Sequence, residues 1–462
     1  MIAGGIHSAR ARMMKLHTNR PRSIGHNLSN LILLAALLIL TDAAAHGQDA
    51  SPTGGSFTCA AGHHDGEQVL TPHSLYADGG AGFDLKTAPA RITGGTCSSD
   101  QPFYFSIAAT DGNYQVVLEL GGPQASRTTV RAESRRLMVD KLVLKAGHTK
   151  HVIFNVNVRT PAIAGAPSDA NTVRLKPREI GVLNWDKKLT LEFNGQNPSV
   201  RSISIHKIDD VPTVYIAGDS TVVDQDKEPW AAWGQMLPAF FGPGVSIANN
   251  AESGETIASF VGERRLAKVE STWKKGDYLL IQFAHNDQKT GPGGVPLPQY
   301  KQLMERYIAD ARDAGVTPIL VTAMNRRSFN ADGTLQMTLG EYPQATRDVA
   351  AQQKVELIDL NAMSKTLFEA LGEQGTLHAF VQYPANTFPG QTTELKDNTH
   401  FNSYGAYELA RAVVQSIRDQ HLDLEPYLRP GISPFDPAHP LPFNQWSLPM
   451  SPFLTTDAPY GH

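Results

Sequence analysis

A serine, a histidine and an aspartate in this 462-residue chain have the types and spacing that acyl transfer requires. Ser220 closely follows the apolar run at 214–217, and a serine hydroxyl is a poor nucleophile unless a base removes its proton. His400 can act as that base. Asp397, three residues earlier, can orient the imidazole by accepting a hydrogen bond from its other ring nitrogen. The three side chains are therefore a candidate nucleophile, base and orienting acid.

Negative charge that develops on an acyl oxygen must be met by hydrogen-bond donors. The candidates are the backbone N–H of Ser220, the N–H of Gly254, which has no side chain to hinder a ligand, and the side-chain amide of Asn286. As isolated residues these are more typical of caps and turns, and Asp397 and His400 are more typical of a polar loop. Their joint occurrence, in one order along the chain, favours a serine hydrolase.

The segments around these candidates predict a sheet that brings them together. From residue 211 onward, short apolar runs alternate with helical patterns, which indicates a parallel sheet covered on both faces. Ser220, Gly254 and Asn286 each follow a predicted strand, and sites in open α/β sheets form beyond the carboxyl ends of strands. Ser403 is placed to cap the last helix. The predicted strands are 213–217, 244–248, 277–283, 316–323 and 355–359, and the predicted helices are 231–241, 256–270, 298–314, 343–353, 361–372 and 403–418.

The residues around the candidates also form five blocks. In chain order these are AGDSTV at 217–222, WGQML at 233–237, AESGET at 251–256, QFAHND at 282–287 and DNTHFNSYGA at 397–406. The blocks resemble those of the SGNH (GDSL-type) hydrolases, and within that family those of rhamnogalacturonan acetylesterases (carbohydrate esterase family twelve). The resemblance spans residues 212–418.

This resemblance implies a flavodoxin-like, three-layer α/β domain with a parallel five-stranded sheet. It further implies that acetyl groups are removed from pectic polysaccharide through an acyl-serine, without a cofactor. The family usually has Gly-His-Asn-Asp in the fourth block, where this chain has Ala284 in the first place. The resemblance assigns the nucleophile to Ser220, the base to His400, the orienting acid to Asp397, and the oxyanion donors to Gly254, Asn286 and the amide of Ser220.

The preceding region, 50–208, has the pattern of an all-β domain. Strand-like runs recur every ten to fifteen residues with Gly, Asn and Asp between them, which is typical of a sandwich or jelly roll. Asp111, Gly112 and Asn113 between two such runs predict a hairpin. The region is similar to the N-terminal, galactose-binding-like domain of bacterial members of the same family. We therefore expect a β-sandwich at 50–208 and a catalytic domain at 212–425.

The two ends of the chain differ in composition from the two predicted domains. Residues 1–47 have the pattern of an export signal: a basic stretch, then the ten apolar residues 31–40, then three alanines. The apolar part is too short to span a bilayer. The protein is expected to be periplasmic or secreted, without a stable membrane span after processing. A proline-rich tail at 426–462 carries aromatic residues that should pack on the body. Cys59 and Cys97 form a disulfide in an oxidising compartment, or stay two buried thiols.

Composition and missing motifs exclude several functions. A net charge of −4 argues against nucleic-acid binding through phosphate neutralisation. The chain contains no G-x-S-x-G, so the nucleophile elbow of α/β-hydrolases is missing, and neither H-E-x-x-H nor C-x-x-C, so a catalytic metal is unsupported.

The expected substrate is an acetylated polysaccharide. Arg326 and Arg327 follow the fourth predicted strand, where they either pair with a galacturonate carboxylate or simply solvate a loop. His285 either touches substrate or braces Asn286. The sequence therefore predicts a carbohydrate O-acetylesterase. The alternatives are an SGNH esterase acting on xylan, peptidoglycan or lipid esters, and a non-catalytic carbohydrate-binding protein.

Overall fold

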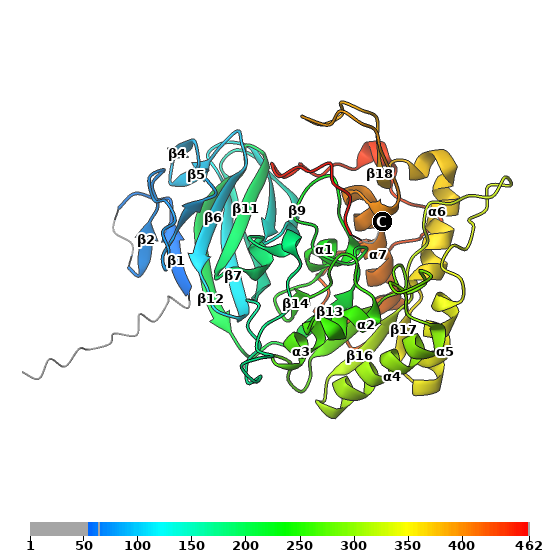
Figure 1. Ribbon diagram of the computed structural model, residues 1–462. Coiled ribbons are helices and arrows are strands. Elements are labelled where there is room, and N and C mark those ends of the chain that lie inside the picture. Colours follow the sequence, from blue (N-terminus) through cyan, green and yellow to red (C-terminus); the bar gives the residue numbers. More distant parts are fainter. Residues whose placement is uncertain (1–53, 63–64, 461–462) are drawn as a thin grey trace, which may run out of the picture. The chain divides into compact units, whose positions relative to one another are not determined.

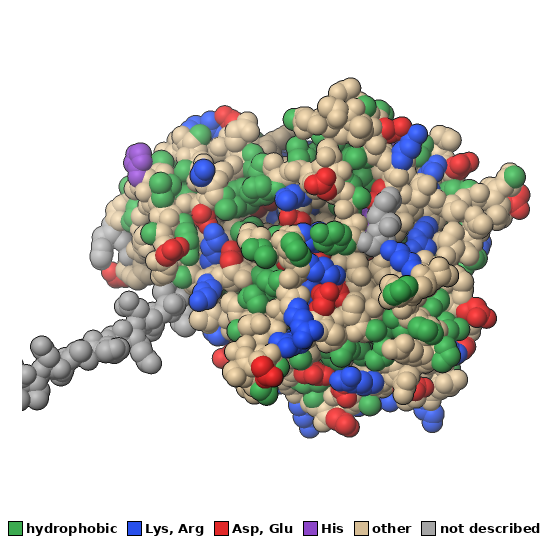
Figure 2. All heavy atoms as spheres, in the orientation of Figure 1, with side chains coloured by type: hydrophobic (Ala, Val, Ile, Leu, Met, Phe, Trp, Pro, Cys, Tyr) green, Lys and Arg blue, Asp and Glu red, His purple; other side chains and the backbone are tan. Residues whose placement is uncertain are grey.

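The computed structural model describes residues 54–62 and 65–460 (Figure 1). The export signal predicted at 1–47 lies outside these residues. Within the described ranges, no helix is both long and apolar enough to cross a membrane. On the face drawn in Figure 2, basic and acidic side chains are interspersed, in keeping with the small net charge.

The first part of the described chain consists of two mainly antiparallel sheets. One has the order β10-β7-β12-β1-β2, with β5 attached to β12 and β4 attached to β5, and the other has the order β3-β6-β11-β8-β9. Large apolar side chains from both sheets, such as Phe105, Leu118 and Ile203, form one buried cluster. The strands are β1 (Gly54–Thr58), β2 (Glu67–Val69), β3 (Ala81–Asp84), β4 (Arg91–Thr93), β5 (Thr96–Ser98), β6 (Phe103–Ala108), β7 (Gly112–Gly122), β8 (Ser126–Ala132), β9 (Arg136–Leu144), β10 (His148–Val158), β11 (Lys188–Gln196) and β12 (Ser199–Ile208).

The hairpin predicted around Asp111, Gly112 and Asn113 is wrong. β6 pairs with β3 and β11 in the five-stranded sheet, whereas β7 pairs with β10 and β12 in the other. The turn residues thus mark a crossing between sheets. Turn chemistry specifies that the chain reverses, but it does not specify which strand becomes the partner.

A disulfide joins Cys59 to Cys97. The predicted disulfide is therefore confirmed, and the alternative of two separate thiols is wrong. Both residues belong to the buried cluster of the β-rich part. The sequence separation of 38 corresponds to about 4 kcal/mol of loop-closure entropy removed from the unfolded chain.

The second part of the chain is an α/β layer structure around a five-stranded sheet of order β14-β13-β15-β16-β17, in which all four pairings are parallel. Each strand lies within two residues of its predicted range. The strands are β13 (Thr213–Gly218), β14 (Ser246–Asn249), β15 (Tyr278–Gln282), β16 (Thr317–Val321) and β17 (Glu356–Ile358). The helices are α1 (Trp233–Met236), α2 (Ile257–Gly262), α3 (Arg265–Glu270), α4 (Leu297–Asp313), α5 (Tyr342–Gln353), α6 (Leu360–Thr376) and α7 (Ser403–Asp419).

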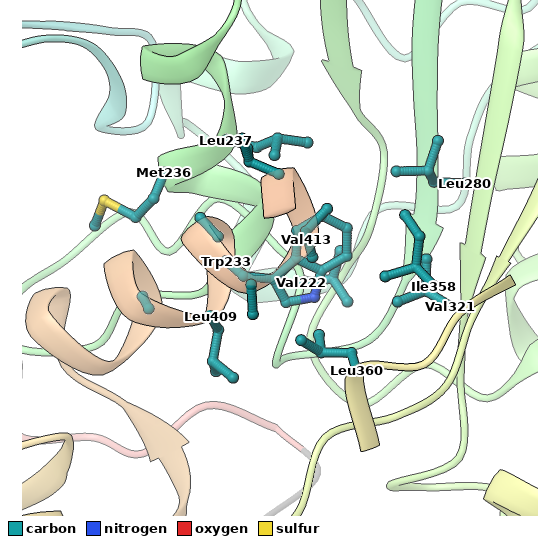
Figure 3. Packing of buried hydrophobic residues seen from close by; sticks show 14 of the residues in the cluster. Val222, Trp233, Met236, Leu237, Leu280, Val321, Ile358, Leu360, Leu409 and Val413 are labelled. Atoms are coloured by element: carbon teal, nitrogen blue, oxygen red, sulfur yellow. The ribbon is translucent and has the colours of Figure 1, made fainter. Parts of the chain in front are cut away.

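Strand periodicity explains why this sheet is covered on both faces. Val214 and Ile216 of β13 join one buried cluster, while the alternate residues Tyr215 and Ala217 join another. Figure 3 shows the first cluster, in which Trp233 of α1 packs among aliphatic side chains from the strands and α7. Because both faces are buried, the strands read as unbroken apolar runs.

Three helix predictions need correction. The range 256–270 is divided into α2 and α3, because Arg264 between them is left-handed, with φ of +65°. The range 231–241 contains only α1 and a short 3-10 helix at Leu237–Phe240, since Pro238 has no N–H to donate. Asn402, rather than Ser403, caps α7, its side chain accepting from the N–H groups of Tyr404 and Gly405.

Two features near the end of the chain complete the fold. β18 (Phe380–Tyr383) and β19 (Leu395–Phe401) form a two-stranded antiparallel sheet that the sequence did not predict. The tail packs on the body as expected: Trp446 lies against Tyr404 and Tyr407 of α7, with ring centroids 5.6 and 6.1 Å apart.

Candidate active site

Ser220 lies two residues beyond the end of β13, in a turn that Asp219 stabilises. The Asp219 carboxylate accepts from the N–H and the hydroxyl of Thr221, at 2.9 and 2.7 Å. The Asp219 carbonyl accepts from the N–H of Val222, and the Ser220 carbonyl accepts from the Gln225 side chain at 3.0 Å. These bonds fix the backbone on both sides of the serine, which is only 1% exposed.

Ser220, His400 and Asp397 form one hydrogen-bonded chain. The Ser220 Oγ lies 2.8 Å from His400 Nε2, and His400 Nδ1 lies 2.7 Å from Asp397 Oδ2. Asp397 and His400 were expected on a loop, but both belong to β19. Asp397 pairs with Val381 and Phe401 pairs with Phe380 of β18, so residues 398–400 bulge from the ladder. Since a regular strand would point residues three apart to opposite faces, this bulge lets both side chains reach one site. The arrangement has the connectivity of a nucleophile, a base and an orienting acid.

Asp397 is held as a carboxylate. Its Oδ1 accepts from the backbone N–H groups of Thr399 and His400 at 2.8 and 2.9 Å, and its Oδ2 also accepts from Trp230 Nε1 at 3.3 Å. Burial raises the pKa of Asp397, but the hydrogen bonds and charge of His400 and these backbone donors outweigh it and lower the pKa to about 2. The carboxylate is therefore charged at neutral pH and can stabilise a protonated His400.

The three candidate oxyanion donors follow adjacent strands. β13 pairs with β14 on one side and β15 on the other, so Ser220, Gly254 and Asn286 all lie beyond the carboxyl ends of neighbouring strands. Gly254 has φ of +81°, a conformation that a side chain disfavours. Asn286 Nδ2 donates to the Glu255 carbonyl at 2.9 Å, which ties the Asn286 amide to the loop that carries Gly254. A side-chain amide has two N–H donors, so one remains for a ligand.

His285 lies in the same site, and of the two arginines Arg326 contacts it. His285 is buried, and its Nδ1 lies 3.4 Å from Asp219 Oδ2. Burial lowers the pKa of His285, with Arg326 and His400 adding to the effect and Asp219 opposing it, so the ring is neutral at neutral pH. Arg326 donates to the His285 carbonyl at 3.0 Å.

Arg327 is bound to the neighbouring loops. Its guanidinium donates to the carbonyl of Glu373 at 2.9 Å, and its backbone N–H donates to the carbonyl of Asn398 at 2.8 Å. Arg327 thus braces the strand that carries Asp397.

Two cations that the sequence did not single out hold the loop around Gly254. Lys176 donates to the Ser253 carbonyl at 2.7 Å and also contacts the Glu255 carboxylate. Arg178 Nε donates to Glu252 Oε1 at 2.7 Å. Both cations come from the segment between β10 and β11, more than 70 positions away. No local pattern in the sequence signals such a pairing.

Two arginines of the β-rich part hold the loop that follows Ser220. Arg136 Nε donates to Asp224 Oδ2 at 2.6 Å, and Arg135 Nη2 lies 2.6 Å from Glu228 Oε1. All four side chains are almost fully buried. The β-rich part is therefore joined to the nucleophile loop by buried ion pairs.

Asp287, the last residue of the fourth block, has an unusual environment. Its Oδ1 accepts from the N–H of Ile257 at 2.8 Å, at the start of α2. Burial raises the pKa of Asp287 to about 8, with the charge of Asp219 contributing. The side chain is thus a neutral carboxylic acid at neutral pH. In the described part of the chain, no three His, Cys, Asp or Glu side chains converge as metal ligands would.

Comparisons with known proteins find a matching family model and related proteins. Residues 216–406 match the model of the GDSL-like lipase/acylhydrolase family. The rhamnogalacturonan acetylesterase RhgT of Bacillus subtilis (strain 168) is 40% identical over 217 residues, which cover 46% of this chain and 93% of that protein.

A second relative extends over the β-rich part as well. The uncharacterized esterase YxiM of Bacillus subtilis (strain 168) is 28% identical over 361 residues, 76% of this chain and 82% of that protein. The crystal structure of the Bacillus subtilis protein YxiM has a TM-score of 0.43 and 23% identity, covering 80% of this chain and 99% of the other.

Proposed function

The chain belongs to the GDSL-like lipase/acylhydrolase family and is a serine carboxylic-ester hydrolase, and we propose that it removes acetyl groups from rhamnogalacturonan or a related pectic polysaccharide. The observation that carries the proposal is the hydrogen-bonded chain from Ser220 through His400 to Asp397. The substrate class is supported by the 40% identity to the rhamnogalacturonan acetylesterase RhgT.

In the proposed mechanism, Ser220 Oγ attacks the acetyl carbonyl while His400 Nε2 takes the hydroxyl proton. Asp397 remains ionised and stabilises the imidazolium. The oxyanion is met by the N–H groups of Ser220 and Gly254 and by the Asn286 amide. The intermediate collapses to acetyl-Ser220, and His400 gives its proton to the sugar oxygen as the carbon–oxygen bond to it breaks. His400 then takes a proton from a water molecule that attacks the acyl-serine, and returns this proton to Ser220 Oγ as acetate leaves.

We further propose that Arg326 contacts an acidic sugar of the substrate. It is half-buried at the site, and its bond to the His285 carbonyl leaves other guanidinium donors for a carboxylate. His285, neutral and wedged between Asp219 and Arg326, is assigned to bracing this contact. Arg327 is assigned to bracing the strand that carries Asp397.

The domain boundaries and export are also proposals. We assign 1–47 to an export signal, 50–208 to a galactose-binding-like β-sandwich, 212–425 to the catalytic domain and 426–462 to the tail. The ion pairs of Arg135 and Arg136 with the nucleophile loop support a structural role for the β-sandwich in the esterase.

The test is acetate release by wild type and Ser220→Ala from acetylated rhamnogalacturonan, acetylated xylan and O-acetylated peptidoglycan. We expect the wild type to prefer rhamnogalacturonan. We expect Ser220→Ala to lose at least about 10³-fold in kcat with an unchanged unfolding midpoint. Ser328→Ala, on the loop after β16, is the control and should keep full activity. Activity of Ser220→Ala above a few per cent would refute the nucleophile, and preference for another polymer would refute the substrate.

A further inference from the structure

The turn between β8 and β9 reaches the loop that follows Ser220. This turn consists of residues 133–135, in which Glu133 and Arg135 have φ of +54° and +63°. The left-handed conformation favours glycine, so a large side chain there costs free energy that its contacts must offset. Arg135 is only 3% exposed. A buried arginine at a position that favours glycine indicates a specific role for its side chain.

The guanidinium of Arg135 holds three points of the loop. Its Nη1 donates to the carbonyl oxygens of Gln225 and Trp230, at 3.0 and 2.9 Å. Its Nη2 lies 2.6 Å from Glu228 Oε1, and both side chains of this ion pair are almost fully buried. A planar guanidinium donates in several fixed directions, which the ammonium group of lysine does not match. Residues 225–230 are thus fixed to one side chain of the β-rich part.

Both ends of this loop contact the proposed catalytic residues. At one end, the Gln225 side chain donates to the Ser220 carbonyl at 3.0 Å. At the other end, Trp230 Nε1 donates at 3.3 Å to Asp397 Oδ2, the oxygen that faces the proposed base. Gln225 and Trp230 are each only 2% exposed, so water does not compete for these bonds. The guanidinium is therefore linked to the nucleophile and to the orienting acid through one residue each.

We propose that Arg135 is a positioning residue for ester hydrolysis, which fixes the nucleophile and the orienting acid from the β-rich part of the chain. This role rests on the proposed catalytic triad and exceeds support of the fold, because the residue would set the rate of the reaction. A displacement of about 1 Å at a reacting group can cost about 10²-fold in rate. Without the three contacts the loop would shift at both ends, and Ser220 and Asp397 would lose their places relative to His400.

Arg135→Lys tests this role by steady-state kinetics on a soluble acetyl ester and by urea unfolding. Lysine keeps a positive charge beside Glu228 but does not reach both carbonyl oxygens, so kcat should fall by about 10²-fold with little change in KM. Arg131→Lys is the matched control, because this buried guanidinium is also paired with a buried carboxylate, that of Glu192, at 2.7 Å. Its other hydrogen bond goes to the Pro449 carbonyl. Arg131→Lys should lose similar stability and keep the wild-type kcat.

Two further variants carry the test if Arg135→Lys does not fold, since each removes one contact to the triad. Trp230→Phe keeps a buried ring but removes the N–H that donates to Asp397. It should lower kcat by about tenfold, the effect of losing one hydrogen bond to a charged group. Gln225→Met removes the donor to the Ser220 carbonyl at a similar side-chain length and should lower kcat several-fold. KM should change little in both variants.

Proton NMR provides a second readout, which a loss of stability alone does not change. His400 Nδ1 and Asp397 Oδ2 are 2.7 Å apart, and a proton in so short a bond to a carboxylate resonates far downfield. This resonance should move in Arg135→Lys and in Trp230→Phe, and it should stay in place in Arg131→Lys.

Three outcomes would overturn the proposal. They are the wild-type kcat in folded Arg135→Lys, the wild-type kcat in both Trp230→Phe and Gln225→Met, and equal losses of kcat in Arg135→Lys and Arg131→Lys at equal loss of stability. The last result would show that Arg135 only stabilises the fold. Failure of the proposed function is distinguishable from all three, because it requires that Ser220→Ala remain active.

Discussion

Arg178 Nε donates to Glu252 Oε1 at 2.7 Å and so joins the segment after β10 to the loop that carries Gly254. Glu252 is almost fully buried, and burial raises the pKa of its carboxyl group while Arg178 opposes that rise. The carboxylate also accepts from the N–H of Ser253, next to Gly254, at 2.8 Å. The ion pair therefore reaches the proposed oxyanion donor through one residue of backbone.

We predict that Arg178→Met lowers kcat by about 10- to 100-fold with little change in KM. The loop would lose its ion pair, so the Gly254 N–H would move away from the position of the oxyanion. The oxyanion develops in the transition state and not in the bound substrate, so kcat should fall more than KM changes. Arg178→Lys should restore part of the rate. Steady-state kinetics on a soluble acetyl ester measures both variants.

Arg174 on the same segment supplies the control, because it is exposed and its guanidinium donates to the Gly262 carbonyl, away from the loop that carries Gly254. Arg174→Met should leave kcat and KM unchanged. A proportional loss of activity and of folded protein in Arg178→Met would mean that Arg178 only stabilises the fold.

We predict that Asp397→Asn lowers kcat by about 10⁴-fold, the effect of a neutral amide that favours the wrong histidine tautomer. An amide replaces the charged Oδ2 that faces His400 Nδ1, so the imidazolium formed during catalysis loses its counter-charge. KM should change little. Pre-steady-state kinetics that kept a fast acylation burst in this variant would contradict the role of Asp397, and the exposed Asp332→Asn is the control.

The sequence predicted most of the sheet and the residues that meet beyond its carboxyl edge, because both depend on local patterns. Buried strands are apolar runs, and Ser220, Gly254 and Asn286 follow their ends. Prediction failed where the outcome depends on distant partners. The turn at Gly112 joins two sheets, and β19 is a strand because β18 pairs with it.

The side chains that hold the loop around Gly254 could not be predicted either, because their partners are also distant in the sequence. Lys176 and Arg178 lie in a segment without regular periodicity, and their partners are 74 to 79 positions away. The cap of α7 was missed by one residue, since Asn402 and Ser403 are both good caps and only the backbone conformation distinguishes them.

We predict that the wild-type protein loses stability as the pH rises from 4 to 8 because of Asp287, and that Asp287→Asn does not show this loss. In the unfolded chain this carboxyl group ionises near pH 4, whereas in the native protein burial raises its pKa to about 8. Between these values the native state holds one proton more than the unfolded state, so stability falls as pH rises, by about 1.4 kcal/mol per pH unit. Asparagine is neutral throughout and can still accept from Ile257.

Urea unfolding at pH 5 and pH 8 measures this effect as the difference between wild type and Asp287→Asn. The variant should gain stability relative to wild type at pH 8. Asp277→Asn is the matched control, because that side chain is also buried and accepts from the Lys274 side chain at 3.0 Å. Parallel curves for wild type and Asp287→Asn would show that Asp287 is ionised in the native protein.

We predict that Ala284→Gly lowers the stability of the protein much less than the loss of a buried methyl group would suggest. Ala284 has φ of +155°, in a region that side chains rarely adopt and that costs about 1–3 kcal/mol. Glycine relieves this strain, but it loses a buried methyl group and gains about 0.4–1 kcal/mol of unfolded-state entropy. Ala323, in the same buried cluster, has no such strain, so Ala323→Gly should lose stability outright. Thermal unfolding measures the stability that each variant loses relative to wild type. The smaller loss expected for Ala284→Gly reports the backbone strain at Ala284. Equal losses in the two variants would show that the backbone at Ala284 is not strained.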